Sequence, residues 1–494
     1  MALLPRIAAI TEEARIAARA LAEFGAGLFD PTVRLGVTGL SRSGKTVFIT
    51  ALVHNLVHGG RLPVFEAMAQ GRLARARLEP QPDDAVPRFD YETHVNALVA
   101  ERRWPESTRH ISELRLVVSY QSAHGSARER TLTLDIIDYP GEWLLDLPLL
   151  AKSYGDWSSE TLGLSRRGAR ARLADAWHAH LATLQPMAKE DEREAVSAAR
   201  LFTDYLRACR DERFAMSLLP PGRFLMPGDL EGSPALTFAP LELPQDASPP
   251  TGSLWAMMER RFEAYKNVVV RPFFREHFAR LDRQVLLVDA LAAFNAGPEA
   301  LRDLEAALAE ILACFRTGRA SFFGALVRPR IDRILFAATK ADHLHHSSHD
   351  RLEHILARVT ERAIARAKFG GALVDVVALA AVRATREATV EWGRERLPSI
   401  MGVPIAGEAV DGQTFDGTSE TAVFPGDLPD DPSPLFDRNA RISGGFSDTV
   451  AESADFRFLR FRPPTLQSKG DKAPTLPHIR LDRALQFLLG DRLR

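Results

Sequence analysis

A glycine-rich stretch near the beginning of the chain has the residue types and spacing of a phosphate-binding loop. Residues 39–46 read GLSRSGKT and satisfy the P-loop pattern G-x-x-x-x-G-K-[ST]. The backbone N–H groups of such a loop surround phosphate oxygens, while Lys45 reaches the β and γ phosphates and the Thr46 hydroxyl binds Mg²⁺. The residues expected to contact the phosphates are Ser41, Arg42, Ser43, Gly44, Lys45, Thr46 and Val47.

Two further motifs follow apolar runs that read as buried strands. Asp138-Tyr139-Pro140-Gly141 predicts a carboxylate that holds Mg²⁺ through water and a Gly141 N–H that reaches the γ-phosphate. Thr339-Lys340-Ala341-Asp342 matches [NT]-K-x-D and predicts guanine, because one carboxylate accepts from both N1–H and N2–H₂ and adenine offers no such pair. The alternatives are a proline turn and a surface Lys-Asp turn. Backbone N–H donation to guanine O6 is expected from the loop of Ala381, Val382 and Arg383.

The remaining Mg²⁺ ligand and the hydrolytic residues are chosen by position. The segment RWPESTRH supplies Ser107 or Thr108 ahead of a predicted strand; Thr108 is favoured as the ligand, and a hydroxyl in a proline turn is the alternative. Glu142 stands where a water-positioning glutamine often follows the glycine, so slow hydrolysis is expected. Arg42 is a candidate for stabilising charge, with a solvated arginine as the alternative. The predicted catalytic residues are therefore Lys45, Arg42, Glu142 and Thr108, and the predicted metal ligands are Thr46, Thr108 and Asp138.

The composition is that of an ordinary folded protein with no strong attraction to nucleic acid or to an anionic membrane. The chain has 494 residues, of which 46% are hydrophobic and 26% charged, and a formal net charge of −1. Its two cysteines, Cys209 and Cys314, support neither a disulfide framework nor a zinc site. No apolar stretch approaches the roughly 20 residues that span a bilayer, and the N-terminus lacks a signal-peptide pattern. A cytoplasmic protein is expected, with a peripheral location at the inner membrane left open.

The succession of apolar patterns predicts an α/β fold. It comprises a P-loop NTPase core sheet of the G-protein-like kind, flanked by helices, with a helical insertion and a small β-rich C-terminal insertion. The expected divisions are an N-terminal helical arm at 1–30, the two halves of the nucleotide-binding core at 31–142 and 284–395, the helical insertion at 143–283, the β-rich insertion at 396–480 and a C-terminal helix at 481–494.

Periodicity also predicts individual elements. Alternating apolar runs indicate a hairpin at 114–120 and 131–137, and buried runs indicate strands at 285–288, 334–338 and 374–379. Helical spacing indicates helices near 166–187, 190–210, 252–280 and 298–316, whereas 58–90 reads as a partly irregular connection. The histidines at 343, 345, 346 and 349 lack an acidic or cysteine partner at ligand spacing and predict a polar loop. Core or hinge anchors are expected of Trp104, Trp143 and Trp255.

Four segments together resemble the YcjX family of bacterial stress-inducible P-loop proteins. They read VTGLSRSGKTVFITALV, DYPGEWLLDLPLL, FAATKADH and LAAVRATREA, and the likeness spans most of the chain. The resemblance implies a small-G-protein-like fold with extra domains, binding of GTP and GDP, and a role in the envelope-stress response beside a membrane-protein partner. Thr339 replaces the common asparagine of G proteins, which alters one orienting hydrogen bond to the P-loop.

The leading hypothesis is a slow Mg²⁺-dependent GTPase that acts on the β-γ phosphoanhydride and works as a switch. The γ-phosphate and Mg²⁺ would order Thr108 and Gly141, and the helical insertion would transmit that state to an unknown protein effector. One alternative is an ATP-using enzyme such as a kinase, and another is a nucleotide-stabilised scaffold with little turnover. The expected ligands are GTP or GDP with Mg²⁺; neither a nucleic-acid partner nor a transmembrane segment is predicted.

Overall fold

A computed structural model describes most of the chain. The described residues are 31–40, 42–106, 110–123, 129–244, 247–314, 331–392, 395–410, 412–433, 458–466 and 473–494. The expected N-terminal arm at 1–30, the P-loop residue Ser41 and the candidate Mg²⁺ ligands Ser107 and Thr108 lie outside these ranges.

The centre of the molecule is a seven-stranded sheet with the order β2-β3-β4-β1-β5-β6-β7. Its strands are β1 (Thr32–Gly39), β2 (Leu73–Glu79), β3 (Ser112–Gln121), β4 (Glu129–Asp138), β5 (Arg283–Val288), β6 (Arg333–Ala338) and β7 (Leu373–Ala378). Neighbouring strands are parallel from β4 to β7, whereas β3 runs antiparallel to both β2 and β4. The β3–β4 hairpin and the three later strands confirm the sequence predictions.

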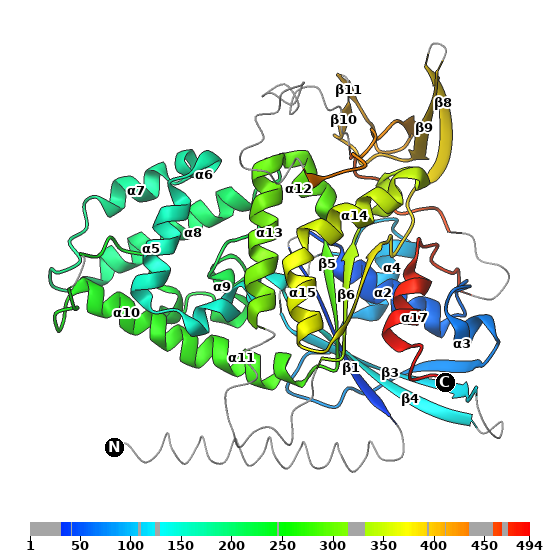
Figure 1. Ribbon diagram of the computed structural model, residues 1–494, viewed down its shortest axis with the longest axis horizontal. Helices are drawn as coiled ribbons and strands as arrows, with labels where there is room; N and C mark the ends of the chain where they lie inside the picture. The colour runs from blue at the N-terminus through cyan, green and yellow to red at the C-terminus, as the bar shows by residue number, and fades with distance from the viewer. Residues whose placement is uncertain are drawn as a thin grey trace.

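Helices cover both faces of this sheet (Figure 1). Alternate residues of β5 belong to different cores: Val285 and Leu287 to one, Leu286 and Val288 to the other. The first face packs against α2 (Lys45–Val57), α4 (Tyr91–Val99) and α17 (Leu481–Leu489). The second packs against α12 (Ala290–Ala296), α13 (Pro298–Ala313), α14 (His349–Val359) and α15 (Glu361–Phe369). This mixed α/β architecture, with small antiparallel sheets elsewhere, confirms the predicted fold class.

A helical lobe, defined here as residues 143–280, connects β4 to β5 and lies beside the second face (Figure 1). It contains part of the 3₁₀ helix η1 (Gly141–Ala151), then α5 (Tyr154–Ser165), α6 (Gly168–Leu173), α7 (Asp175–Leu181), α8 (Glu192–Arg210), α9 (Gly222–Leu225), α10 (Leu254–Tyr265), the π-helical turn η4 (Lys266–Val270) and α11 (Arg271–Glu276). Its core is continuous with that of the second face. The lobe is therefore packed against the central sheet through one shared core.

Two element predictions in these regions are wrong. The helix expected near 166–187 is split into α6 and α7, while α5 precedes it and begins at a capping box formed by Ser153 and Asp156. The connection at 58–90 contains α3 (Glu66–Ala69) and the edge strand β2. Ala76 is the fully buried residue of β2, so its exposed neighbours conceal the alternation that would reveal a strand.

The last part of the chain adds small sheets near the end of β7. β8 (Arg386–Trp392), β9 (Glu395–Gly402) and β12 (Thr421–Val423) form one antiparallel sheet, and β10 (Ala409–Val410) pairs with β11 (Gln413–Thr414). β8 thus begins inside the range expected for the nucleotide core and pairs with β9. Within the described parts of the chain, none of the helices has the length and apolar character needed to cross a membrane.

Candidate functional site

The loop between β1 and α2 is shaped to hold an anion. Arg42 (φ 62°) and Gly44 (φ 76°) have left-handed backbone conformations, and the Ser43 N–H donates to the Leu40 carbonyl oxygen at 3.1 Å. Gly44 adopts this conformation without strain, and as the N-cap of α2 it has no side chain to cover the first N–H groups of the helix. An uncovered helix N-terminus attracts phosphate through its N–H groups and its dipole.

Lys45 and Asp138 meet in a buried ion pair at the floor of this loop. Lys45 Nζ lies 2.7 Å from Asp138 Oδ1, and the two side chains are 10% and 1% exposed. The sheet brings them together, because Val37 of β1 is in register with Asp138 at the end of β4. The Thr46 hydroxyl is buried nearby, 3.4 Å from the Glu106 carbonyl oxygen. A threonine hydroxyl and a carboxylate are hard oxygen ligands of the kind that Mg²⁺ prefers. The side chains of Thr46 and Asp138 therefore fit that ion.

The backbone at Gly141 lies directly against the P-loop. A Cβ atom added to Gly141 would lie 1.9 Å from the Gly39 carbonyl oxygen, a distance that no side chain tolerates. Only glycine therefore permits this approach, which brings the Asp-x-x-Gly turn into contact with the first glycine of the P-loop. The P-loop and the Asp-x-x-Gly turn are far apart in the sequence, yet both Gly39 and Gly141 line the same cavity.

The third motif forms the opposite end of the site. Lys340 has a left-handed backbone conformation (φ 62°), and its ammonium group pairs with the carboxylate of Asp289, the residue after β5. The Thr339 N–H donates to the Val288 carbonyl oxygen at 3.0 Å. Asp342 is held from behind, since its Oδ2 accepts from the Ala384 N–H at 2.9 Å. These contacts fix the turn at the ends of β6 and β7 and orient the Asp342 carboxylate.

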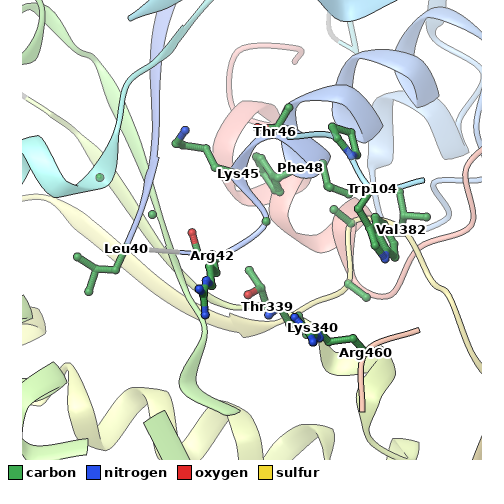
Figure 2. A pocket seen from close by; sticks show the side chains of 18 of the residues that line it. Leu40, Arg42, Lys45, Thr46, Phe48, Trp104, Thr339, Lys340, Val382 and Arg460 are labelled. Atoms are coloured by element: carbon green, nitrogen blue, oxygen red, sulfur yellow. The ribbon is translucent and has the colours of Figure 1, made fainter. Parts of the chain in front are cut away.

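One cavity of about 280 Å³ joins the three motifs. Figure 2 shows the P-loop side chains of Arg42, Lys45 and Thr46 and, from other elements, Thr339 and Val382 around it. The predicted site residues that line the cavity are Arg42, Ser43, Gly44, Lys45, Thr46, Val47, Gly141, Glu142, Thr339, Lys340, Asp342, Ala381 and Val382. Asp138 does not line the cavity itself but pairs with Lys45, which does. Ser41 and Thr108 lie outside the described residues.

Arg383 is placed differently from the other members of its predicted loop. Its backbone N–H donates to the Pro477 carbonyl oxygen at 2.7 Å, and its guanidinium Nε donates to the Thr385 carbonyl oxygen at 2.9 Å. The cavity wall at this point is instead built by residues 379–382. A backbone N–H of Ala381 or Val382 is therefore better placed to face a base than that of Arg383.

Several residues of the cavity wall were not predicted. Trp104, expected to be a core or hinge anchor, lines the cavity near Val382, and its indole N–H donates to the Phe461 carbonyl oxygen at 2.6 Å (Figure 2). Arg460 and Phe461 come from the C-terminal part of the chain, and Arg210 comes from the helical lobe. None of these positions carries a local motif, because the fold brings them to the cavity from distant parts of the sequence.

The segment after Gly141 is bonded to the helical lobe. Asp146 is fully buried; its Oδ1 accepts from the Gly222 N–H at 2.7 Å, and its Oδ2 accepts from the Tyr265 hydroxyl at 2.7 Å and from the Arg223 N–H at 3.3 Å. The Trp143 indole N–H donates to the Met226 carbonyl oxygen at 2.9 Å. These hydrogen bonds connect the segment after Gly141 directly to α9 and α10.

Asp146 predicts a pH-dependent stability of the helical lobe. Burial raises the pKa of its carboxyl from 3.8 to about 6, although its hydrogen bonds oppose that shift. The folded protein thus holds this proton more tightly than the unfolded chain. The stability that the protonated carboxyl contributes is fully present below pH 4 and is lost as the pH rises through about 6. Between pH 4 and pH 7 we expect the free energy of unfolding of the parent to fall by about 1 to 3 kcal/mol relative to Asp146→Asn.

Denaturant titrations of the two proteins across this pH range measure the difference. Asp204→Asn is the control, because Asp204 lies on the exposed side of α8 in the same lobe, where its carboxylate is 50% exposed. A stability difference between parent and Asp146→Asn that stays constant from pH 4 to pH 7 would show that folding does not raise the pKa of Asp146.

The histidine-rich turn after Asp342 has an acidic neighbour that spacing did not reveal. His345, His346 and Glu387 place their ligand atoms within 4.8 Å of one another, and His346 Nδ1 lies 2.9 Å from Glu387 Oε2. Glu387 belongs to β8, far along the chain from the histidines. His346 and Glu387 are exposed and pair with each other, so the arrangement is that of a surface ion pair beside the cavity.

The sheet order, the loop after β1 and the cavity at the carboxyl ends of the parallel strands define a P-loop NTPase-like protein. The chain belongs to the YcjX-like family, DUF463, whose family model matches residues 33–493. A "Ras-like GTPase YcjX" of Escherichia coli (strain K12) is 38% identical over 487 residues, covering 94% of this chain and 97% of that protein. A "Ras-like GTPase YcjX" of Shewanella oneidensis (strain MR-1) is 35% identical over 492 residues, covering 94% and 95%. The family resemblance of the four sequence segments is thereby confirmed.

Proposed function

We propose that this protein binds GTP and GDP together with Mg²⁺, hydrolyses GTP slowly and acts as a nucleotide-controlled switch. The observation that carries the proposal is the shared cavity, in which a phosphate-binding loop at one end faces the Thr339–Asp342 turn at the other. Relatives whose names describe Ras-like GTPases support hydrolysis of GTP. The guanine preference follows from the fixed carboxylate of Asp342, which is an acceptor only.

In this proposal the phosphates lie against residues 41–47 and the Gly141 N–H. Lys45 contributes its charge to the β and γ phosphates, and Thr46 and Asp138, with Thr108, would hold Mg²⁺. When bound, the metal ion would neutralise part of the negative charge of the phosphates. Asp342 accepts from the guanine N1 and N2 edge, the aliphatic stem of Lys340 covers the base, and the backbone of residues 379–382 faces its oxygen.

Slow hydrolysis is proposed because of the residue after Gly141. A glutamine amide can both donate to and accept from an attacking water, whereas the Glu142 carboxylate only accepts and brings negative charge toward the phosphates. The Glu142 side chain is 9% exposed and paired with Arg210 at 2.9 Å. Arg42, our candidate for charge stabilisation within the loop, pairs with Glu212 at 2.6 Å and is 51% exposed, so it must exchange that partner to reach a phosphate.

The switch would act through the helical lobe. Hydrogen bonds of Asp146 and Trp143 connect the segment after Gly141 to α9 and α10, and this supports transmission of the nucleotide state to the lobe and from there to a protein effector. Participation in the envelope-stress response, beside a membrane-associated partner in the cytoplasm or at the inner membrane, is the part of the proposal that rests on the family resemblance alone.

Titration of labelled GTP, GDP and ATP, each with and without Mg²⁺, tests the proposal directly. We expect GTP and GDP to bind at least about 100-fold more tightly than ATP, since a site with a buried acceptor rejects a base that leaves it unpaired. Mg²⁺ should strengthen GTP binding, and turnover of GTP should stay below about 1 s⁻¹. Equal affinity for ATP would favour the ATP-using enzyme, and tight GTP binding without phosphate release would favour the scaffold.

A further inference from the structure

Arg210 is the basic group that the helical lobe contributes to the cavity. It is the last residue of α8 and is packed at the site's edge, where its side chain is 25% exposed. Its Nη2 lies 2.9 Å from Glu142 Oε1, and its Nη1 lies 3.6 Å from the Met226 sulfur. A cation is favourable at this position even without a ligand, because the carboxyl end of a helix carries the negative end of its dipole.

The basic side chains of the described cavity wall differ in where their acidic partners lie. Lys45 pairs with Asp138, Lys340 with Asp289, Arg42 with Glu212, and Arg460 with both Glu212 and Glu408. None of these four carboxylates is among the residues that line the cavity. Arg210 is different, because its partner Glu142 lines the cavity as well. This pair therefore presents one positive and one negative group to the same space.

The Arg210–Glu142 pair lies at the end of the cavity where the proposed function places the γ-phosphate. Glu142 follows Gly141, whose backbone contacts Gly39 of the P-loop, and the proposed function places the γ-phosphate at the Gly141 N–H. GTP brings an additional phosphate with its negative charge to this end of the site, while GDP does not. An unscreened glutamate would repel the added charge, whereas a guanidinium attracts it through a planar fork that matches phosphate oxygens.

We propose that Arg210 is a specificity-determining residue that contacts the γ-phosphate and makes the protein prefer GTP to GDP, with Glu142 as its partner when that phosphate is absent. The inference rests on the proposed function, and it assigns the preference for the triphosphate to the helical lobe. Because Arg210 ends a helix whose other face is buried through Phe202, Tyr205 and Leu206, a shift of its guanidinium toward the nucleotide pulls on the lobe itself.

The test is the ratio of two affinities, measured by calorimetry with a non-hydrolysable GTP analogue and with GDP in the presence of Mg²⁺. Arg210→Ala should weaken binding of the GTP analogue about tenfold or more, while GDP binding changes less than about threefold. Arg207→Ala is the matched control: Arg207 lies one turn earlier on α8, is 60% exposed and pairs with Asp204 at 3.2 Å. It should change neither affinity.

A second comparison separates direct contact from an effect through Glu142. In a Glu142→Gln background, Arg210→Ala should still lower the preference for the GTP analogue, because the lost contact is with the phosphate. If Arg210 only holds Glu142 in place, its removal from that background leaves the ratio unchanged, and the proposal is overturned. Glu142→Gln by itself should raise the preference, since the guanidinium is then released from its acidic partner.

The outcomes also distinguish this inference from the proposed function. A parent protein that binds neither nucleotide contradicts the proposed function, whereas a parent that prefers GTP while Arg210→Ala keeps the same ratio contradicts the role of Arg210 only. Equal losses for both nucleotides would likewise overturn it, because they indicate a general defect of the site. If Arg210→Ala proves unfolded by circular dichroism, Arg210→Gln decides the question, since it removes the charge and keeps most of the length.

Discussion

Lys45→Ala is expected to lower the affinity for GTP and for GDP by about 30- to 700-fold, which corresponds to about 2 to 4 kcal/mol. The ammonium group is 2.7 Å from Asp138 Oδ1 and 10% exposed, so its charge acts in a poorly solvated place at the end of the cavity. Removing it deletes a charge-assisted contact to the phosphates and leaves the buried Asp138 carboxylate opposing them. Calorimetric titration with both nucleotides measures the loss.

The control for Lys45→Ala is a lysine that is also largely buried and paired but lies away from the cavity. Lys152 meets these conditions, because its ammonium group is 2.6 Å from Glu160 and 3.1 Å from Glu310 and its side chain is 20% exposed. Lys152→Ala should leave nucleotide affinity unchanged even if it lowers stability. Wild-type affinity in Lys45→Ala would mean that the cavity is not a phosphate site, and the P-loop assignment would have to be abandoned.

The elements closest to the chemistry were the most predictable from sequence. The P-loop, the Asp138–Gly141 turn and the Thr339–Asp342 turn each combine a short fixed spacing with an apolar strand, and that combination is specific because both the backbone path and the ligand chemistry constrain it. The sheet then brings the three together, since the carboxyl ends of its parallel strands lie at one edge. Local pattern and fold class therefore sufficed to predict that these motifs face one cavity.

The contacts that connect the cavity to the rest of the molecule were not predictable in this way. Arg210 is an ordinary helix-ending arginine in sequence, and it differs from Arg207 only because the fold places its side chain beside Glu142. Asp146 likewise gives no sign that it will be buried among backbone N–H groups from α9. Pairings between residues so far apart depend on how the helical lobe packs against the sheet, which periodicity does not specify.

Two local predictions failed for similar reasons. The strand β2 lies at an edge of the sheet and buries little of its surface, so its charged residues dominate the pattern. The helix expected near 166–187 begins only at Gly168, where the Ala169 N–H donates to Glu299 of α13 at 3.1 Å, and it is divided again between α6 and α7. In both cases the place of the segment in the fold, which its own sequence pattern does not specify, decides the structure.

Asp342→Asn should exchange guanine specificity for xanthine specificity. In the parent, Oδ2 accepts from the Ala384 N–H at 2.9 Å, which leaves Oδ1 free of that bond to face a base. An asparagine keeps the Ala384 hydrogen bond only with its carbonyl oxygen toward that N–H, so its NH₂ group takes the place of Oδ1. That group is a donor, and it would face the N1–H and N2–H₂ donors of guanine.

The expected result is a loss of GTP affinity of about 2 kcal/mol or more, near 30-fold, and a gain of similar size for xanthosine triphosphate, whose C2 carbonyl accepts from the new amide. Parallel titrations of both nucleotides with parent and variant measure the exchange. Asp350→Asn serves as the control, because Asp350 is a 77% exposed carboxylate on α14 that pairs with Arg480 outside the cavity. Two outcomes would show that the Asp342 carboxylate does not contact the base: an Asp342→Asn protein that binds GTP as the parent does, or one whose affinity for xanthosine triphosphate does not rise. The ATP-using alternative would then explain the P-loop better than a G-protein-like switch.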